Sequence, residues 1–325
     1  MSEDNINEEK VEEVENEELV QNELEQEVSD KPYQDVIEDA RKDLFKSYSK
    51  SRKISNIVMF VVVAAIVGIM FLIISNNNVL KIVGYSLAGA LVLGMILFYV
   101  INRKKFPNKT KEYVNLVAKE LNNRAFSKQG FDEIKSDPEE KLKLDDLAGD
   151  GIYAEATGVN SRNVVRGTFK GHHFLYAEAA LVRPSTRKQQ VPPLFVGRYI
   201  SIPNQMKHEG RVVFVFKNPK EPLDLPNAVN DLAVLEDKED FAVYGPEGFN
   251  YHKDINNKLL SKLKDITIGG HLLNINLVLW GGHTALYISY DDTIMSVPFD
   301  KQFDYQGFEQ SFDDLYACFE AITEE

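Results

Sequence analysis

The stretch Ile54–Ile74, which reads ISNIVMFVVVAAIVGIMFLII, decides the architecture of this chain. It carries no charged residue over 21 positions, and fourteen of its residues are Leu, Ile, Val or Phe. As a helix the stretch would span about 31 Å, which is close to the thickness of the hydrocarbon core of a bilayer. We therefore predict a transmembrane helix over residues 54–74.

A second apolar run, VLKIVGYSLAGALVLGMILFYVI, covers residues 79–101. Its one charge, Lys81, lies near the end, where a long side chain can reach the headgroups. Only the polar segment Ser75–Asn78 separates the two runs, and backbone groups in lipid must be paired internally, so we expect a tight hairpin of two helices. Small residues recur every four positions, and we expect them to serve intrachain packing, with dimerisation as the alternative: Ala64 and Gly68, then Ser86, Ala90 and Gly94.

Basic residues flank the two runs unevenly. Six precede the first run and five follow the second, whereas only Lys81 lies near the connecting loop. The positive-inside rule then predicts a multi-pass membrane protein with both termini in the cytoplasm. The flanking bases are Arg41, Lys42, Lys46, Lys50, Arg52 and Lys53, then Arg103, Lys104, Lys105, Lys109 and Lys111.

The charge of the chain is concentrated in its first residues. Residues 1–40 hold sixteen acids and two lysines, whereas the net charge of the whole chain is −13. We expect residues 1–32 to form a disordered acidic tail, either a solvated leader or an arm that recruits a basic partner. The negative total argues against general nucleic-acid binding. The single cysteine, Cys318, fits a reducing compartment and is expected to be a buried packing residue rather than a nucleophile.

Two further helices are predicted beside the apolar runs. In residues 33–53, apolar residues at helical spacing alternate with bases, which predicts an amphipathic juxtamembrane helix. This helix either lies on the inner leaflet or carries bases that only fix the topology. For residues 105–127 we predict a helix followed by a connector, with Pro107 in the first turn of the helix. The apolar stripe of this helix is expected to pack on the soluble domain or on a second protomer.

From about residue 150 the periodicity becomes strand-like. Residues 128–147 read as a charged connector, and helices are expected after it only near 255–264 and 308–323. We predict an α+β fold, in which the transmembrane hairpin precedes a cytoplasmic, mostly antiparallel β-sheet domain (150–325) with helices on one side. The expected strands are 151–159, 163–169, 173–182, 194–202, 211–217, 241–244, 272–280 and 284–290.

The sequence contains none of the usual signatures of phosphate-binding loops, zinc proteases, thiol redox motifs or serine hydrolases. We therefore assign no catalytic residue and expect no cofactor and no metal site. The candidate binding residues are His172, His173 and Glu178. Glu178 lies in an otherwise apolar strand, where a carboxylate must be paired or face solvent. Arg166 or Arg198 is its expected partner across the sheet.

Three segments carry a resemblance to a known family: Val165–Glu178 (VRGTFKGHHFLYAE), Pro193–Tyr199 (PLFVGRY) and Phe241–Tyr244 (FAVY). Over about residues 100–322 the chain resembles the bacterial membrane proteins of domain-of-unknown-function family 3137. The resemblance implies two membrane helices ahead of the soluble domain and a location in the bacterial inner membrane. It implies no catalytic residue. The family often has an acidic-tipped stretch after the Phe-x-Val-Tyr strand, where this chain has Gly245-Pro246-Glu247.

Three function classes remain open. The first is a membrane-anchored cytoplasmic binding or scaffold module, whose partners are the lipid bilayer and a protein, with a homo-oligomer left open. The second is a hydrolase-like membrane enzyme that uses Glu178 with His172 or His173, which requires these side chains to meet within roughly 10 Å. The third is a channel or transporter subunit, although two spans without intramembrane charge offer no polar pathway.

Overall fold

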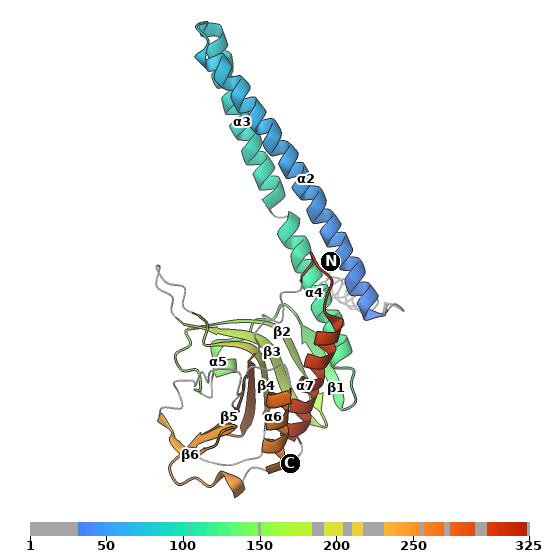
Figure 1. Cartoon of the computed structure of the whole chain (residues 1–325), viewed down its shortest axis with the longest axis vertical. Coiled ribbons are helices and arrows are strands. Elements are labelled where there is room, and N and C mark those ends of the chain that lie inside the picture. Colours follow the sequence, from blue (N-terminus) through green and yellow to red (C-terminus); the bar gives the residue numbers. More distant parts are fainter. Residues whose placement is uncertain are drawn as a thin grey trace, which may run out of the picture.

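Figure 1 presents the computed structural model of the chain, in which a long helical hairpin projects from a sheet domain. The structure describes residues 32–103, 105–148, 151–183, 192–203, 210–216, 231–253, 257–269, 274–289 and 298–323. The predicted acidic tail, apart from Pro32, lies outside the described residues.

Two helices form the hairpin, α2 (Tyr33–Ile74) and α3 (Asn78–Arg103). Both are long and apolar enough to cross a membrane, which suggests a membrane association. The large exposed apolar side chains of the described residues lie between Ile54 and Leu97, with the exceptions of Phe45 and Val234. The turn between the helices is tight, as predicted, and Oδ1 of Asn77 caps α3 by accepting a hydrogen bond from the Val79 N–H at 2.9 Å.

The helices α2 and α3 contact each other through a different face from the predicted one. Gly84 is buried against α2, where an added Cβ would lie 2.9 Å from Cγ1 of Ile73. In contrast, the Cβ positions of Gly68 and Gly94 meet open space. The prediction that the small-residue stripe serves intrachain packing is therefore wrong, because spacing alone does not tell which face of a helix meets its neighbour. The other members of the stripe are also exposed: Ala64, Ser86 and Ala90.

The first half of α2 packs on α4 (Lys105–Ala125), and we call residues 33–53 of α2 together with α4 the stalk. Ile37 and Leu44 of α2 are buried in one cluster with Val117 of α4, and Phe299 and Phe303 pack against that cluster. The amphipathic helix predicted over 33–53 is thus the beginning of α2, and its apolar face is covered by protein rather than by a leaflet. The helix predicted over 105–127 corresponds to α4, with Pro107 in its first turn.

Within the described residues, nine antiparallel strands form one sheet in the order β1-β2-β3-β4-β9-β8-β5-β7-β6. The predicted α+β class with a mostly antiparallel sheet is confirmed. Tight turns at Lys170–Gly171 and Gly281–Gly282 join β2 to β3 and β8 to β9, and all four residues have positive φ angles. The strands are β1 (Phe131–Asp137), β2 (Gly158–Phe169), β3 (His172–Val182), β4 (Phe195–Pro203), β5 (Arg211–Phe216), β6 (Ala233–Asp237), β7 (Phe241–Gly245), β8 (Asn274–Trp280) and β9 (His283–Ser289).

Apolar clusters cover both faces of the sheet. On one face α6 (Asn257–Gly269) and α7 (Tyr305–Thr323) lie side by side, and the end of α4 joins them through Phe126. On the other face α5 (Leu144–Ala148) buries Leu147. The prediction of helices on one side alone is therefore incomplete. A short 3₁₀ helix, η2 (Tyr251–Lys253), precedes α6.

The edges of the sheet differ most from the prediction. Residues 131–137, predicted as part of a connector, form the edge strand β1, and residues 233–237 form the opposite edge strand β6. Residues 151–157, predicted as the first part of a strand, form turns and loop instead. Within β1 only Phe131 is fully buried, so its sequence FDEIKSD lacks the alternation by which strands are recognised.

Candidate functional site

The two candidate histidines open β3 at the solvent-exposed end of the β2–β3 hairpin. His172 faces Phe169 and His173 faces Thr168 in the register, and both histidines are exposed. Glu178 follows six residues after His172 on the same strand, which places their Cα atoms about 20 Å apart at the rise of a strand. His173 and Glu178 point to opposite faces, because they are separated by an odd number of residues. The structure does not bring the three candidate residues together.

Glu178 lies at the centre of a buried polar network. Its side chain is 7 % exposed. Oε1 accepts hydrogen bonds from Nδ2 of Asn163 at 3.4 Å and from the Tyr176 hydroxyl at 3.3 Å. The other oxygen, Oε2, is buried and accepts no hydrogen bond within the part of the chain that the structure describes. Directly opposite Glu178 are Arg162 on β2 and Arg198 on β4.

One arm of this network reaches the stalk. Asn163 has a positive φ of 55° at a bulge in β2, which turns its amide toward the helices. The Asn163 Oδ1 accepts a hydrogen bond from Nδ2 of Asn122 at 2.5 Å, and Asn122 lies near the end of α4. Asn122 also donates to Oγ of Ser136 on β1 at 2.7 Å. The bulge therefore connects the buried carboxyl to the helix that leads toward the hairpin.

The other arm reaches α7. Arg198 is 2 % exposed, and it donates to the backbone oxygen of Ser311 at 3.0 Å and to Oγ of Ser311 at 2.6 Å. Arg198 is thus the cross-strand neighbour of Glu178, as expected, but these two hydrogen bonds go to Ser311 rather than to the carboxylate. Arg166, the alternative, donates to Glu140 at 2.5 Å instead. We call this set the Glu178 network: Asn122, Ser136, Asn163, Tyr176, Glu178, Arg198 and Ser311.

The electrostatics of the network are set by burial. Loss of water raises the pKa of the Glu178 carboxyl, and the positive charges of Arg198 and Arg162 oppose this shift without overcoming it. A protonated Glu178 can donate a hydrogen bond as well as accept one. Protonation of Glu178 would therefore change the hydrogen bonding at the centre of the network.

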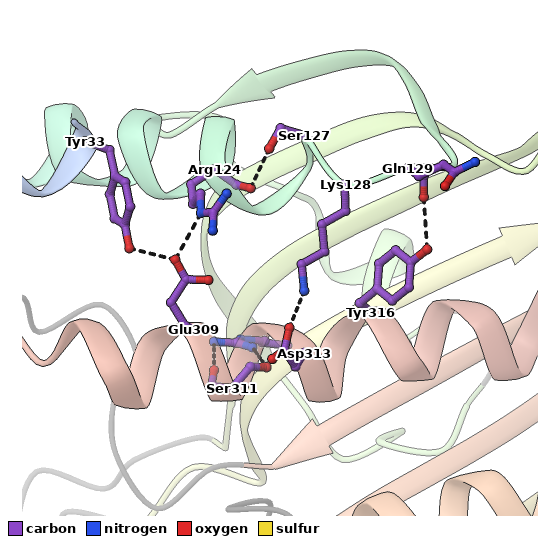
Figure 2. A network of polar contacts seen from close by, with 10 residues as sticks. Tyr33, Arg124, Ser127, Lys128, Gln129, Glu309, Ser311, Asp313 and Tyr316 are labelled. Atoms are coloured by element: carbon purple, nitrogen blue, oxygen red, sulfur yellow. Dashed lines mark hydrogen bonds and ion pairs between the residues drawn. The ribbon is translucent and has the colours of Figure 1, made fainter. Parts of the chain in front are cut away.

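A second polar group joins the stalk to α7 at the surface, as Figure 2 shows. The Tyr33 hydroxyl at the start of α2 donates to Oε1 of Glu309 at 2.7 Å, and Nε of Arg124 on α4 donates to the same oxygen at 3.0 Å. One turn further along, Lys128 forms an ion pair with Asp313. We call these five residues the junction. Sequence reasoning missed it, although Arg124 and Lys128 share the four-residue spacing of Glu309 and Asp313.

Two other expectations concern reactive side chains. Cys318 on α7 is fully buried, as predicted, and burial raises the pKa of its thiol to about 12. A thiol in that state is not a nucleophile at neutral pH. Among the described residues, no three His, Cys, Asp or Glu side chains are placed to hold a metal ion.

Comparison with known proteins adds little to this geometry. No family model matches the chain, and no curated protein matches it. A solved structure that aligns with this chain is the crystal structure of the mycobacterial trehalose monomycolate transport factor A, TtfA. The alignment covers 62 % of the residues of this chain and 95 % of the residues of the TtfA chain, and the aligned residues are 14 % identical. The TM-score is 0.34, which is too low to show a shared fold.

Proposed function

We propose that this chain is a membrane-anchored binding or scaffold module of a bacterial cell membrane. In this proposal α2 and α3 cross the membrane as a hairpin, both termini are cytoplasmic, and the sheet domain presents its surface to a protein partner. The observation that carries the proposal is the concentration of exposed large apolar side chains between Ile54 and Leu97. In water an exposed apolar surface of this kind would favour aggregation, whereas in a bilayer the acyl chains of the lipids cover it.

The distribution of charge supports the orientation. Eleven bases flank the hairpin at its open end and one lies near its loop. The resemblance of residues 100–322 to domain-of-unknown-function family 3137 supports the bacterial membrane, and we propose membership of that family on the same residues.

The structure of the stalk supports an anchoring role. The stalk is held to the sheet domain by the buried cluster around Ile37 and Val117, by the junction, and by the arm of the Glu178 network that ends at Asn122. Such a mechanical connection suits a module that keeps a binding surface at a set place beside the membrane. The enzyme alternative required Glu178 and a histidine to meet, and their separation along β3 does not favour it.

The proposal is tested by fractionation and by accessibility. Full-length protein expressed in a Gram-negative host should remain in the membrane pellet after an alkaline carbonate wash and dissolve only with detergent. External protease should leave the sheet domain intact in spheroplasts and digest it in inverted vesicles. Recovery in the soluble fraction, or digestion in intact spheroplasts, would contradict the anchoring and the orientation respectively.

The binding role needs a separate experiment. Chemical cross-linking in intact cells, followed by purification in detergent, should recover the same protein with the full-length chain in repeated trials. The control is an unrelated two-span membrane protein at the same expression level. If both proteins recover the same background, the binding role is wrong.

A further inference from the structure

Charge changes sign along the stalk part of α2. Asp35, Asp39 and Asp43 lie in the half of this segment that is near the sheet domain. After Asp43 the next acid in the sequence is Glu112, and the residues between them hold ten bases, nine of which flank the open end of the hairpin. The end of the stalk that meets the apolar part of the hairpin is therefore strongly cationic, whereas the other end is not.

Three of these bases form one stripe. Lys46, Lys50 and Lys53 are exposed and recur at intervals of four and three residues, so they share one face of α2. This face lies opposite the one that buries Ile37 and Leu44 against α4, because successive residues of a helix turn by about 100°. The stripe thus points away from the protein.

A fourth base comes from α4. Nζ of Lys109 donates a hydrogen bond to Oγ of Ser47 at 3.2 Å, which places this exposed lysine at the level of Lys46 and Lys50, on the side of α2 between the stripe and α4. Two neighbouring bases are engaged elsewhere, since Arg41 pairs with Glu38 at 2.7 Å and Lys111 with Glu139 at 2.5 Å, whereas the exposed Arg52 lies on another face of α2. We call Lys46, Lys50, Lys53 and Lys109 the basic collar.

The depth of the collar matches a layer of lipid headgroups. If Ile54 lies at the edge of the hydrocarbon core, Lys50 and Lys46 lie about 6 and 12 Å outside it along the helix axis. A headgroup layer is about 5–8 Å thick, and charges are felt over a Debye length of about 8 Å at physiological salt. Long lysine side chains can therefore place all four ammonium groups among the phosphates.

We propose that the basic collar is a binding site for anionic phospholipid headgroups, such as phosphatidylglycerol, in the leaflet where the hairpin begins and ends. The proposal rests on the membrane anchoring proposed above and names the lipid class that the anchor selects. Four cations on two packed helices form a fixed array of charges, and such an array favours a leaflet rich in negative headgroups over a zwitterionic one.

The test is a lipid titration of the full-length protein in a non-ionic detergent, with bound lipids counted by native mass spectrometry. Phosphatidylglycerol and phosphatidylcholine with identical acyl chains are compared. We expect the wild-type protein to bind phosphatidylglycerol with a Kd about tenfold lower. In the variant with Lys46→Gln, Lys50→Gln, Lys53→Gln and Lys109→Gln, this preference should disappear.

Two matched variants keep the test falsifiable. Lys119→Gln, Lys135→Gln, Lys143→Gln and Lys258→Gln remove four exposed lysines away from the collar and should leave the preference intact. The fourfold Lys→Arg variant of the collar should also keep it, because the charge is retained. Inorganic phosphate should weaken the binding no more than chloride at equal ionic strength.

Equal affinity of the wild-type protein for the two lipids would overturn the proposal. Equal loss of preference in the collar variant and in the distant-lysine variant would do so as well. These failures differ from a failure of the anchoring itself, which would appear as a chain that needs no detergent after the carbonate wash.

Discussion

Glu178 and Arg198 occupy directly opposite positions on β3 and β4, and both side chains are almost completely buried. Arg198 continues the connection to Ser311 of α7, and Glu178 continues it through Asn163 to Asn122 of α4. Because an isolated charge in a protein interior is strongly destabilising, each of the two residues depends on the other.

This dependence predicts the outcome of a double-mutant cycle. Arg198→Met should lower the free energy of unfolding by about 1–3 kcal/mol, because it removes the two hydrogen bonds to Ser311 and one of the two positive charges opposite Glu178. Adding Glu178→Gln should recover part of that loss. The measurement is denaturant unfolding of the purified protein in detergent. Strictly additive effects of the two changes would contradict the coupling.

The raised pKa of Glu178 predicts a dependence of stability on pH. A raised pKa means that the folded state holds the proton more tightly than the unfolded chain does, so the contribution of this group is complete below the ordinary pKa of 4.5 and decreases as pH rises toward the folded value. Melting temperatures measured between pH 4 and pH 8 should therefore fall more steeply for the wild-type protein than for Glu178→Gln. Parallel curves would show that the carboxyl does not titrate in this way.

Gly84 is the position at which α2 and α3 approach most closely among the glycines of the hairpin. Gly84→Leu should separate the helices and lower the stability of the hairpin by about 1–3 kcal/mol, because even a Cβ would lie 2.9 Å from Ile73. Gly89→Leu is the control, since no atom lies within 4 Å of its Cβ position. Cysteine cross-linking between the two helices would report the separation, and equal yields in the two variants would contradict it.

Removing the junction is expected to destabilise the start of α2 locally rather than the whole fold. Glu309→Ala removes the acceptor of Tyr33 and Arg124, so amide exchange at the start of α2 should become about two- to fivefold faster, as for a partly exposed ion pair. Glu320→Ala on the same helix breaks the 3.0 Å pair with Lys170, away from the stalk. Exchange at residues 33–40 should not change in this control, and a similar change in both variants would argue against the junction.

The single cysteine gives a direct measure of the packing of α7. Cys318 is fully buried, and burial raises the pKa of its thiol to about 12, so a maleimide should label less than a tenth of the folded protein at pH 7. Labelling should become complete in denaturant. Rapid labelling of the folded protein would show that α7 opens away from the sheet.

Much of the architecture was accessible from the sequence. The runs at 54–74 and 79–101 predict the hairpin because few soluble helices carry no charge, or a single one near the end, over such a length. The two-residue turns at Lys170–Gly171 and Gly281–Gly282 follow from local chemistry, and Arg198 could be named from the sequence as a cross-strand neighbour of Glu178.

The features that were missed depend on contacts between distant segments. Tyr33 and Glu309 are 276 positions apart, and no local pattern indicates that they meet. The apolar spacing of Ile37 and Leu44 fits a leaflet as well as a protein surface, so the sequence alone did not show that α4 covers this face. The edge strand β1 packs mainly through Phe131, which leaves too weak a pattern to recognise.

The unbroken course of α2 has a mechanical consequence. About 21 residues of this helix lie outside its apolar run, which corresponds to a rod of about 30 Å that continues directly into the proposed span. A tilt of the hairpin by about 10° would swing the far end of the rod by about 5 Å. A change in bilayer thickness or a bound neighbour in the membrane would thus be converted, by leverage, into displacement of the sheet domain.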